Sequence, residues 1–194
     1  MAKKKHNFDE LCAIRDQLYT EVDKESDRGL ALVAADYLSN LLEALLRQVF
    51  VDDGTANTKE VLDDLFRESG ALGSFDIKIR LAYLMGLIGR DTYHALGLIR
   101  EIRNIAAHSV EPFSLDSPGV RQKCEQLTAW EDYQALAKEV GHPARKHFMF
   151  TFWWVLVEIM LRTGRRRHAE VGKEFCVPMD ELPDDAEVAE PCIE

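Results

Sequence analysis

The sequence predicts an all-α protein: a single-domain bundle of about seven or eight helices around one long central helix. Apolar residues recur three and four positions apart along most of the chain, which is the period of an amphipathic helix. Glycines, prolines and capping residues separate these stretches, and no useful length alternates apolar and polar residues as a strand would. With 194 residues, 46% of them hydrophobic, the chain can bury one sizeable core.

The first part of the chain supplies three predicted helices. The first is expected over residues 8–22, where apolar side chains line one face. Ser26 or Asp27 is placed to cap the second, which we expect to be the central helix because its apolar face is wide and continuous over residues 30–49. A short third helix is predicted over residues 58–66, beginning at a threonine.

An αα-hairpin is predicted over residues 74–108. Ser74 is expected to be the N-cap of its first arm. Gly89 is expected to stop that arm and Asp91 to cap the second, which leaves a very short link. The apolar period of the second arm continues to His108, where the helix is expected to end.

The remaining helices are shorter until the last. Two are predicted over residues 120–127 and 133–140, and Pro143 is placed in the first turn of a long final helix. The periodicity then stops. We therefore expect a helical domain over residues 1–172 and an acidic, flexible tail over residues 173–194.

The charge is concentrated at the C-terminal end. The net charge is −10, and eight acidic residues lie from Glu174 onward without a lysine or arginine, which leaves −2 for the rest. A protein that binds DNA through its phosphates normally has a basic face. The basic residues cluster only at Lys3–Lys5 and at Arg162 with Arg165–Arg167. The second cluster is explained by cations at a helix C-terminus, or by a partner such as the tail or RNA.

Three features of the composition point to a cytoplasmic protein without a metal or cofactor. No apolar segment follows the N-terminal lysines as in a secretory signal. The longest apolar stretch, residues 148–161, is too short to cross a bilayer. The cysteines have neither paired nor metal-ligand spacing and are expected to be reduced thiols; they are Cys12, Cys124, Cys176 and Cys192.

The end of the hairpin's second arm holds three candidate catalytic residues, Arg103, Asn104 and His108, and a candidate binding residue, Arg100. Arg100, Asn104 and His108 are spaced four apart and share one stripe of a helix, with Arg103 beside it. Histidine can transfer a proton at a ribose hydroxyl, arginine can stabilise phosphorane charge, and an amide can orient either. Arg103 and His108 lie about 140 degrees apart round the helix, so two chains would be needed to bring both to one phosphate.

A structural interpretation of the same residues stays open. Asn104 and His108 would satisfy backbone groups at the helix end, and the arginines would form ion pairs. The acidic residues available for these pairs are Asp36, Glu43 and Glu101. Asp27 and Arg28, which precede the central helix, are further candidate binding residues, or simply a cap and a solvated cation.

Several segments between residues 27 and 109 resemble the MtlR family of mannitol operon repressors and their paralogues. They are Asp27-Arg28-Gly29-Leu30-Ala31-Leu32-Val33-Ala34-Ala35, Gly73-Ser74-Phe75, Lys78-Ile79, Leu81-Ala82-Tyr83, Gly86-Leu87-Ile88, Ile99-Arg100-Glu101-Ile102-Arg103-Asn104 and Ala107-His108-Ser109. The resemblance implies an all-helical negative regulator of transcription without an evident helix-turn-helix. The second arm of the hairpin is also apolar and poor in arginine before Arg100, unlike a helix that reads bases.

A shorter resemblance points to another class of function. Arginine followed by asparagine, with histidine five positions after the arginine, resembles the motif of the HEPN superfamily of helical ribonucleases. By this resemblance Arg103 and His108 would be catalytic, Asn104 would support them, and a dimer would complete the site.

The function predicted first is negative regulation of transcription through a protein partner, by a homodimer that does not itself read an operator. The alternative is metal-independent cleavage or binding of RNA. A small-molecule pocket between the helices is a third possibility.

Overall fold

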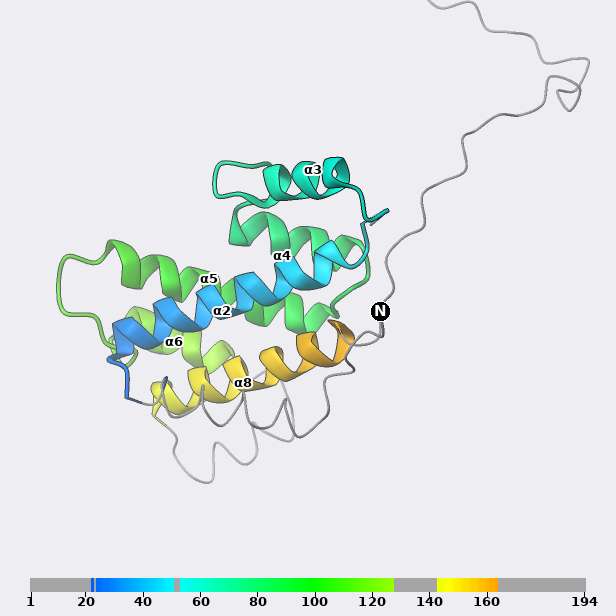
Figure 1. Ribbon diagram of the computed structural model, residues 1–194. Coiled ribbons are helices and arrows are strands. Elements are labelled where there is room, and N and C mark those ends of the chain that lie inside the picture. The colour runs from blue at the N-terminus through cyan, green and yellow to red at the C-terminus, as the bar shows by residue number, and fades with distance from the viewer. Residues whose placement is uncertain (1–21, 23, 51–52, 128–142, 164–194) are drawn as a thin grey trace, which may run out of the picture.

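The computed structural model describes residues 22, 24–50, 53–127 and 143–163, and this part of the chain is all helical (Figure 1). The all-α prediction is confirmed. The helices predicted over residues 8–22 and 133–140, and the acidic tail, lie outside the described residues. Six helices are described: α2 (Asp27–Arg47), α3 (Ala56–Phe66), α4 (Phe75–Leu84), α5 (Arg90–His108), α6 (Pro118–Gln126) and α8 (Ala144–Thr163).

The central helix is α2, as predicted. It contacts α4, α5 and α8, and the core is built around its apolar face. By length and composition alone α2 is also the one helix of the described residues that could cross a membrane. Its core-facing side chains are instead buried against the other helices of the bundle, as in a core helix. These are Leu30, Ala31, Ala34, Ala35, Leu38, Leu42, Leu45 and Leu46.

The starts of α2 and α3 can be compared with the predicted caps. Of the two candidates for α2, Ser26 is the N-cap, and its Oγ accepts a hydrogen bond from the Gly29 amide at 3.1 Å. The short helix α3 begins before Thr58, because the Thr55 hydroxyl accepts the Thr58 amide at 3.3 Å and is the N-cap. A threonine thus marks the start, but it is the one three positions earlier.

The hairpin of α4 and α5 is confirmed, with a correction at its turn. Ser74 caps α4 by accepting the Ile77 amide at 3.2 Å, as predicted. The stop is Gly86 rather than Gly89, because Gly86 has the left-handed φ of 66° that glycine adopts without a steric cost. Gly89 is instead the N-cap of α5, and the helix ends at His108 as predicted.

A polar network fastens α8 to the hairpin. The Thr92 hydroxyl of α5 donates to Glu158 of α8. Arg162, one turn later on α8, pairs with Glu158 at 2.7 Å and donates to the Leu87 carbonyl at 3.2 Å. Arg162, the first of the predicted C-terminal cations, therefore bridges two segments of the bundle.

Candidate functional site

A polar groove of about 600 Å³ lies between α2, α4, α5 and the end of α3, and several of the predicted residues line it. A pocket between helices of a bundle is a usual place for a ligand. Most side chains along it are polar, which distinguishes it from the apolar core behind it. Its lining includes Asp36, Ser39, Asn40 and Glu43 of α2, Phe66 and Glu68, Ser74, Asp76 and Lys78, and Arg100, Arg103 and Asn104 of α5.

The α2 wall of the polar groove contains a buried ion pair. Lys78 of α4 is only 4% exposed, and its Nζ lies 2.7 Å from Glu43 Oε2. Arg47 pairs with the other oxygen of Glu43 at 2.9 Å. Burial by itself raises the pKa of Glu43, but the hydrogen bonds from Lys78 and Arg47 outweigh it, so the pKa is lowered. Glu43 is therefore a carboxylate at neutral pH.

The opposite wall is the C-terminal half of α5. Arg100, Arg103 and Asn104 are spaced so that they share one helix face. Arg100 pairs with Asp76 at 2.6 Å, and its buried Nε has no hydrogen-bond acceptor. Arg103 is exposed, and its Nη1 donates to Asn104 Oδ1 at 3.2 Å.

These contacts differ from the ion pairs that the structural interpretation offered. Arg100 pairs with Asp76, which the sequence did not single out, rather than with Asp36, Glu43 or Glu101. Glu101 instead binds Lys123 of α6 at 2.5 Å. Arg100 reaches Asp76 because the hairpin folds the first turn of α4 against the C-terminal half of α5.

His108 is not part of the polar groove. It is the last residue of α5 and is exposed, and its side chain forms no hydrogen bond or ion pair with the described residues. Arg103 and His108 therefore occupy different parts of the helix surface, in agreement with their angular separation. Of the candidate site residues predicted from the sequence, the groove of one chain therefore brings together Arg100, Arg103 and Asn104.

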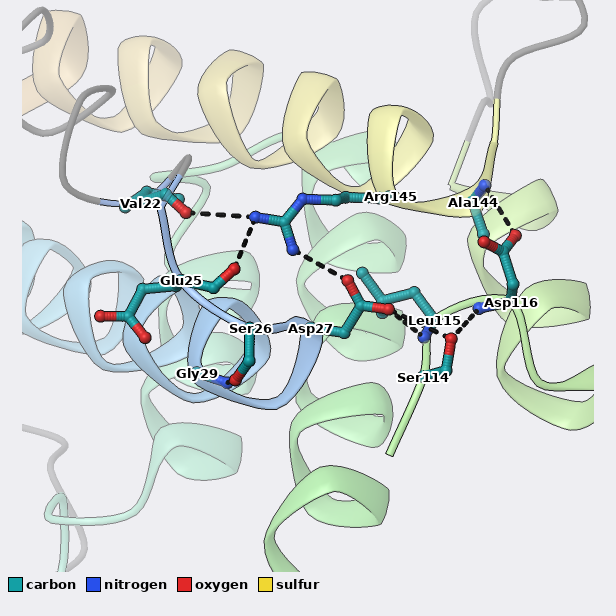
Figure 2. Close-up of polar contacts among 10 residues, drawn as sticks. All are labelled: Val22, Glu25, Ser26, Asp27, Gly29, Ser114, Leu115, Asp116, Ala144 and Arg145. Atoms are coloured by element: carbon teal, nitrogen blue, oxygen red, sulfur yellow. Dashed lines mark hydrogen bonds and ion pairs between the residues drawn. The ribbon is translucent and has the colours of Figure 1, made fainter. Parts of the chain in front are cut away.

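Asp27 lies in a separate polar cluster where α2, α8 and the loop before α6 meet (Figure 2). Its Oδ1 binds Arg145 at 2.8 Å, and its Oδ2 accepts the Leu115 amide at 2.9 Å and the Ser114 hydroxyl at 3.2 Å. Burial raises the pKa of Asp27, but the hydrogen bonds from Leu115, Arg145 and Ser114 outweigh it and lower the pKa. This carboxylate holds the bundle together.

Arg28 has a similar structural role. Its Nη2 donates to the carbonyls of Ser109 at 3.0 Å and Glu111 at 2.6 Å. These carbonyls follow the end of α5 directly. Arg28 therefore positions the segment that carries His108, and neither Arg28 nor Asp27 lines the polar groove. Among the described residues, no three His, Cys, Asp or Glu side chains are grouped as a metal site would require.

A second surface feature lies on α4 and its C-terminal end. Ile77 is 40% exposed, Tyr83 38%, Leu84 81% and Met85 41%. Ile77 and Leu84 are two helical turns apart and share a face. The Tyr83 ring stacks on Tyr93 of α5 with centroids 4.5 Å apart. We call Ile77, Tyr83, Leu84 and Met85 the α4 apolar patch.

The sequence model of the family described as mannitol repressor, MtlR, matches residues 14–164. The chain belongs to the MtlR family. The match includes every described helix and both surface features, and it ends before the acidic residues of the C-terminal segment. A comparison with curated proteins finds no match.

A solved structure is similar to this MtlR family member over most of its length. It is the X-ray structure of the MtlR-HPr complex from Escherichia coli, with a TM-score of 0.61 and 18% sequence identity. The alignment covers 76% of this chain and 98% of that chain. At this identity the likeness establishes a shared fold.

Proposed function

We propose that this protein is a negative regulator of transcription that acts by binding another protein, through the α4 apolar patch. The observation that carries the proposal is the exposure of four large apolar side chains on α4 and its C-cap residue in an MtlR family member. Single exposed apolar residues are ordinary, but adjacent ones favour a protein interface. The aromatic pair Tyr83 and Tyr93 adds rigid contact area of the kind that interfaces use.

Direct operator reading has less support. A recognition helix must enter the major groove with its side chains exposed. α5, the second arm of the hairpin, is instead in contact with α2, α4, α6 and α8. The buried side chains of its first half include Thr92, Ala95 and Leu96. The net charge of −10 also disfavours sequence-independent binding to phosphates.

HPr is the first partner to test, because the similar solved structure is a complex of MtlR with HPr. We expect saturable binding of purified HPr in a calorimetric titration. We also expect no sequence-specific complex with operator DNA at physiological salt when the protein is the only component. A tight operator complex formed by the protein alone would contradict the proposal.

RNA cleavage is the second candidate, and it is favoured by the exposure of both Arg103 and His108 on α5. Exposed side chains can reach a partner copy, and the proposal requires a homodimer that brings Arg103 of one chain near His108 of the other. His108→Ala should abolish any cleavage of RNA, while circular dichroism remains unchanged because His108 has no partner among the described residues. If the His108→Ala variant still cleaves RNA, His108 is not the catalytic residue.

A further inference from the structure

We propose that the polar groove binds a small zwitterion of the amino-acid class, with its carboxylate at Arg103 and Asn104 and an ammonium group at Asp36 and Glu68. The proposal concerns a site separate from the α4 apolar patch.

Most charges along the polar groove are compensated within the described chain. Glu43 is paired with Lys78 and Arg47, and Asp76 is paired with Arg80 and Arg100. Such pairs hold their side chains in place and offer a ligand little net charge.

Three lining residues remain uncompensated within the described part of the chain. Arg103 has an amide as its acceptor rather than a carboxylate, and neither Asp36 nor Glu68 has an ion-pair partner there. One guanidinium and two carboxylates therefore border the same groove. A ligand that carries both a carboxylate and an ammonium group matches this set of charges, whereas a simple anion or a simple cation matches only one side.

The carboxylate end has further donors available. Asn104 Oδ1 accepts from Arg103, which holds the guanidinium beside the amide and leaves the Asn104 NH₂ group to donate. Arg100 lines the same groove, and its Nη1 already pairs with Asp76 at 2.6 Å. A carboxylate also forms stronger hydrogen bonds with an arginine guanidinium than with a neutral donor, because both partners are charged.

The ammonium end is formed by α2 and the segment after α3. Asp36, Ser39 and Asn40 are spaced three and four apart and present one polar face to the groove. Their oxygens can all accept hydrogen bonds from an ammonium group. The groove volume of about 600 Å³ lies within the range of small-molecule sites and accommodates a free amino acid.

The test uses L-lysine and cadaverine, its analogue without the carboxylate, titrated into the full-length protein by calorimetry at low ionic strength. L-lysine should bind saturably and more tightly than cadaverine. Arg103→Gln should weaken L-lysine by about tenfold without weakening cadaverine, because only L-lysine has a carboxylate for Arg103. Asp36→Asn should weaken both compounds.

Arg121→Gln is the matched control. It removes the same charge from α6, where Arg121 forms an exposed pair with Glu125 away from the groove. This substitution should change neither the affinity for L-lysine nor the affinity for cadaverine. The proposal is overturned if L-lysine does not bind saturably. It is also overturned if Arg103→Gln weakens both compounds equally, or if Arg121→Gln weakens L-lysine as much as Arg103→Gln does. HPr binding is measured separately, so the two proposals fail independently.

Discussion

Arg145 in the first turn of α8 and Asp27 in the first turn of α2 form an ion pair 2.8 Å long across 118 positions of sequence. Arg145 also donates to the Glu25 carbonyl at 2.8 Å, and Asp27 accepts the Leu115 amide at 2.9 Å (Figure 2). This cluster joins three segments of the bundle at one end. Asp27 thus acts on the fold rather than on the polar groove.

Asp27→Asn should lower the free energy of unfolding near neutral pH by about 1–2 kcal/mol, measured by urea denaturation. The expected loss of stability is modest because the side chains of Asp27 and Arg145 are about a quarter exposed, so solvent partly screens their charges. Asp64→Asn is the control, since Asp64 forms an exposed pair with Arg67 on the surface of α3. Equal losses in the two variants would contradict the structural role of Asp27.

The same variant should reveal the pH dependence of that contribution. The pKa of Asp27 is lowered on folding, so its stabilising effect is fully present above the unfolded value of 3.8 and is lost as the pH falls through the folded value. The difference in unfolding free energy between wild type and Asp27→Asn should therefore be constant near neutral pH and shrink below about pH 4. A difference that grows on acidification would refute the assignment.

Two glycines should respond in opposite directions to alanine. Gly86→Ala should destabilise the protein by about 1 kcal/mol, because alanine adopts the left-handed φ of 66° only with strain. Gly97→Ala should stabilise it by about 0.5–1 kcal/mol, since Gly97 lies inside α5 and an added Cβ meets nothing within 4 Å. Thermal unfolding should therefore show a lower melting temperature than wild type for Gly86→Ala and a higher one for Gly97→Ala.

Cys124 should be unreactive in the folded protein. Burial, with a smaller effect of nearby carboxylates such as Asp116, raises the pKa of its thiol from 9.0 to about 12. Near pH 8 its thiolate fraction should be about a thousandfold lower than in the unfolded chain. In a variant with the other three cysteines changed to serine, a disulfide reagent should react rapidly only after denaturant is added. Rapid labelling of the native protein would be the contrary result.

Local features of the fold could be predicted from the sequence because local chemistry determines them. The Ser74 cap depends on an amide three positions away, and the angular separation of Arg103 and His108 follows from the helical period alone. The choice between Gly86 and Gly89 as the stop could not be made, since both are suitable residues. Only the backbone places Gly86 at a left-handed φ and Gly89 at an extended start.

The polar groove could be predicted only in part. Arg100, Arg103 and Asn104 were identified because they share one helix. Asp76 and Lys78 were missed because their partners, Arg100 and Glu43, come from other helices. The packing of α4 on α5 decides the first pair, and the packing of the hairpin on α2 decides the second. The one local signal was that Lys78 lies directly between Ile77 and Ile79, and a lysine that is buried with such neighbours needs an ion-pair partner.

The most direct test of the proposed regulation is the affinity for HPr of two matched variants. Leu84→Asp changes the most exposed residue of the α4 apolar patch, and Val61→Asp makes a similar change on α3, where Val61 is 51% exposed. We predict that Leu84→Asp weakens HPr binding at least about tenfold, because it places a charge in the proposed interface, and that Val61→Asp leaves it unchanged. Equal affinities for the two variants, or no HPr binding by the wild type, would contradict the proposal.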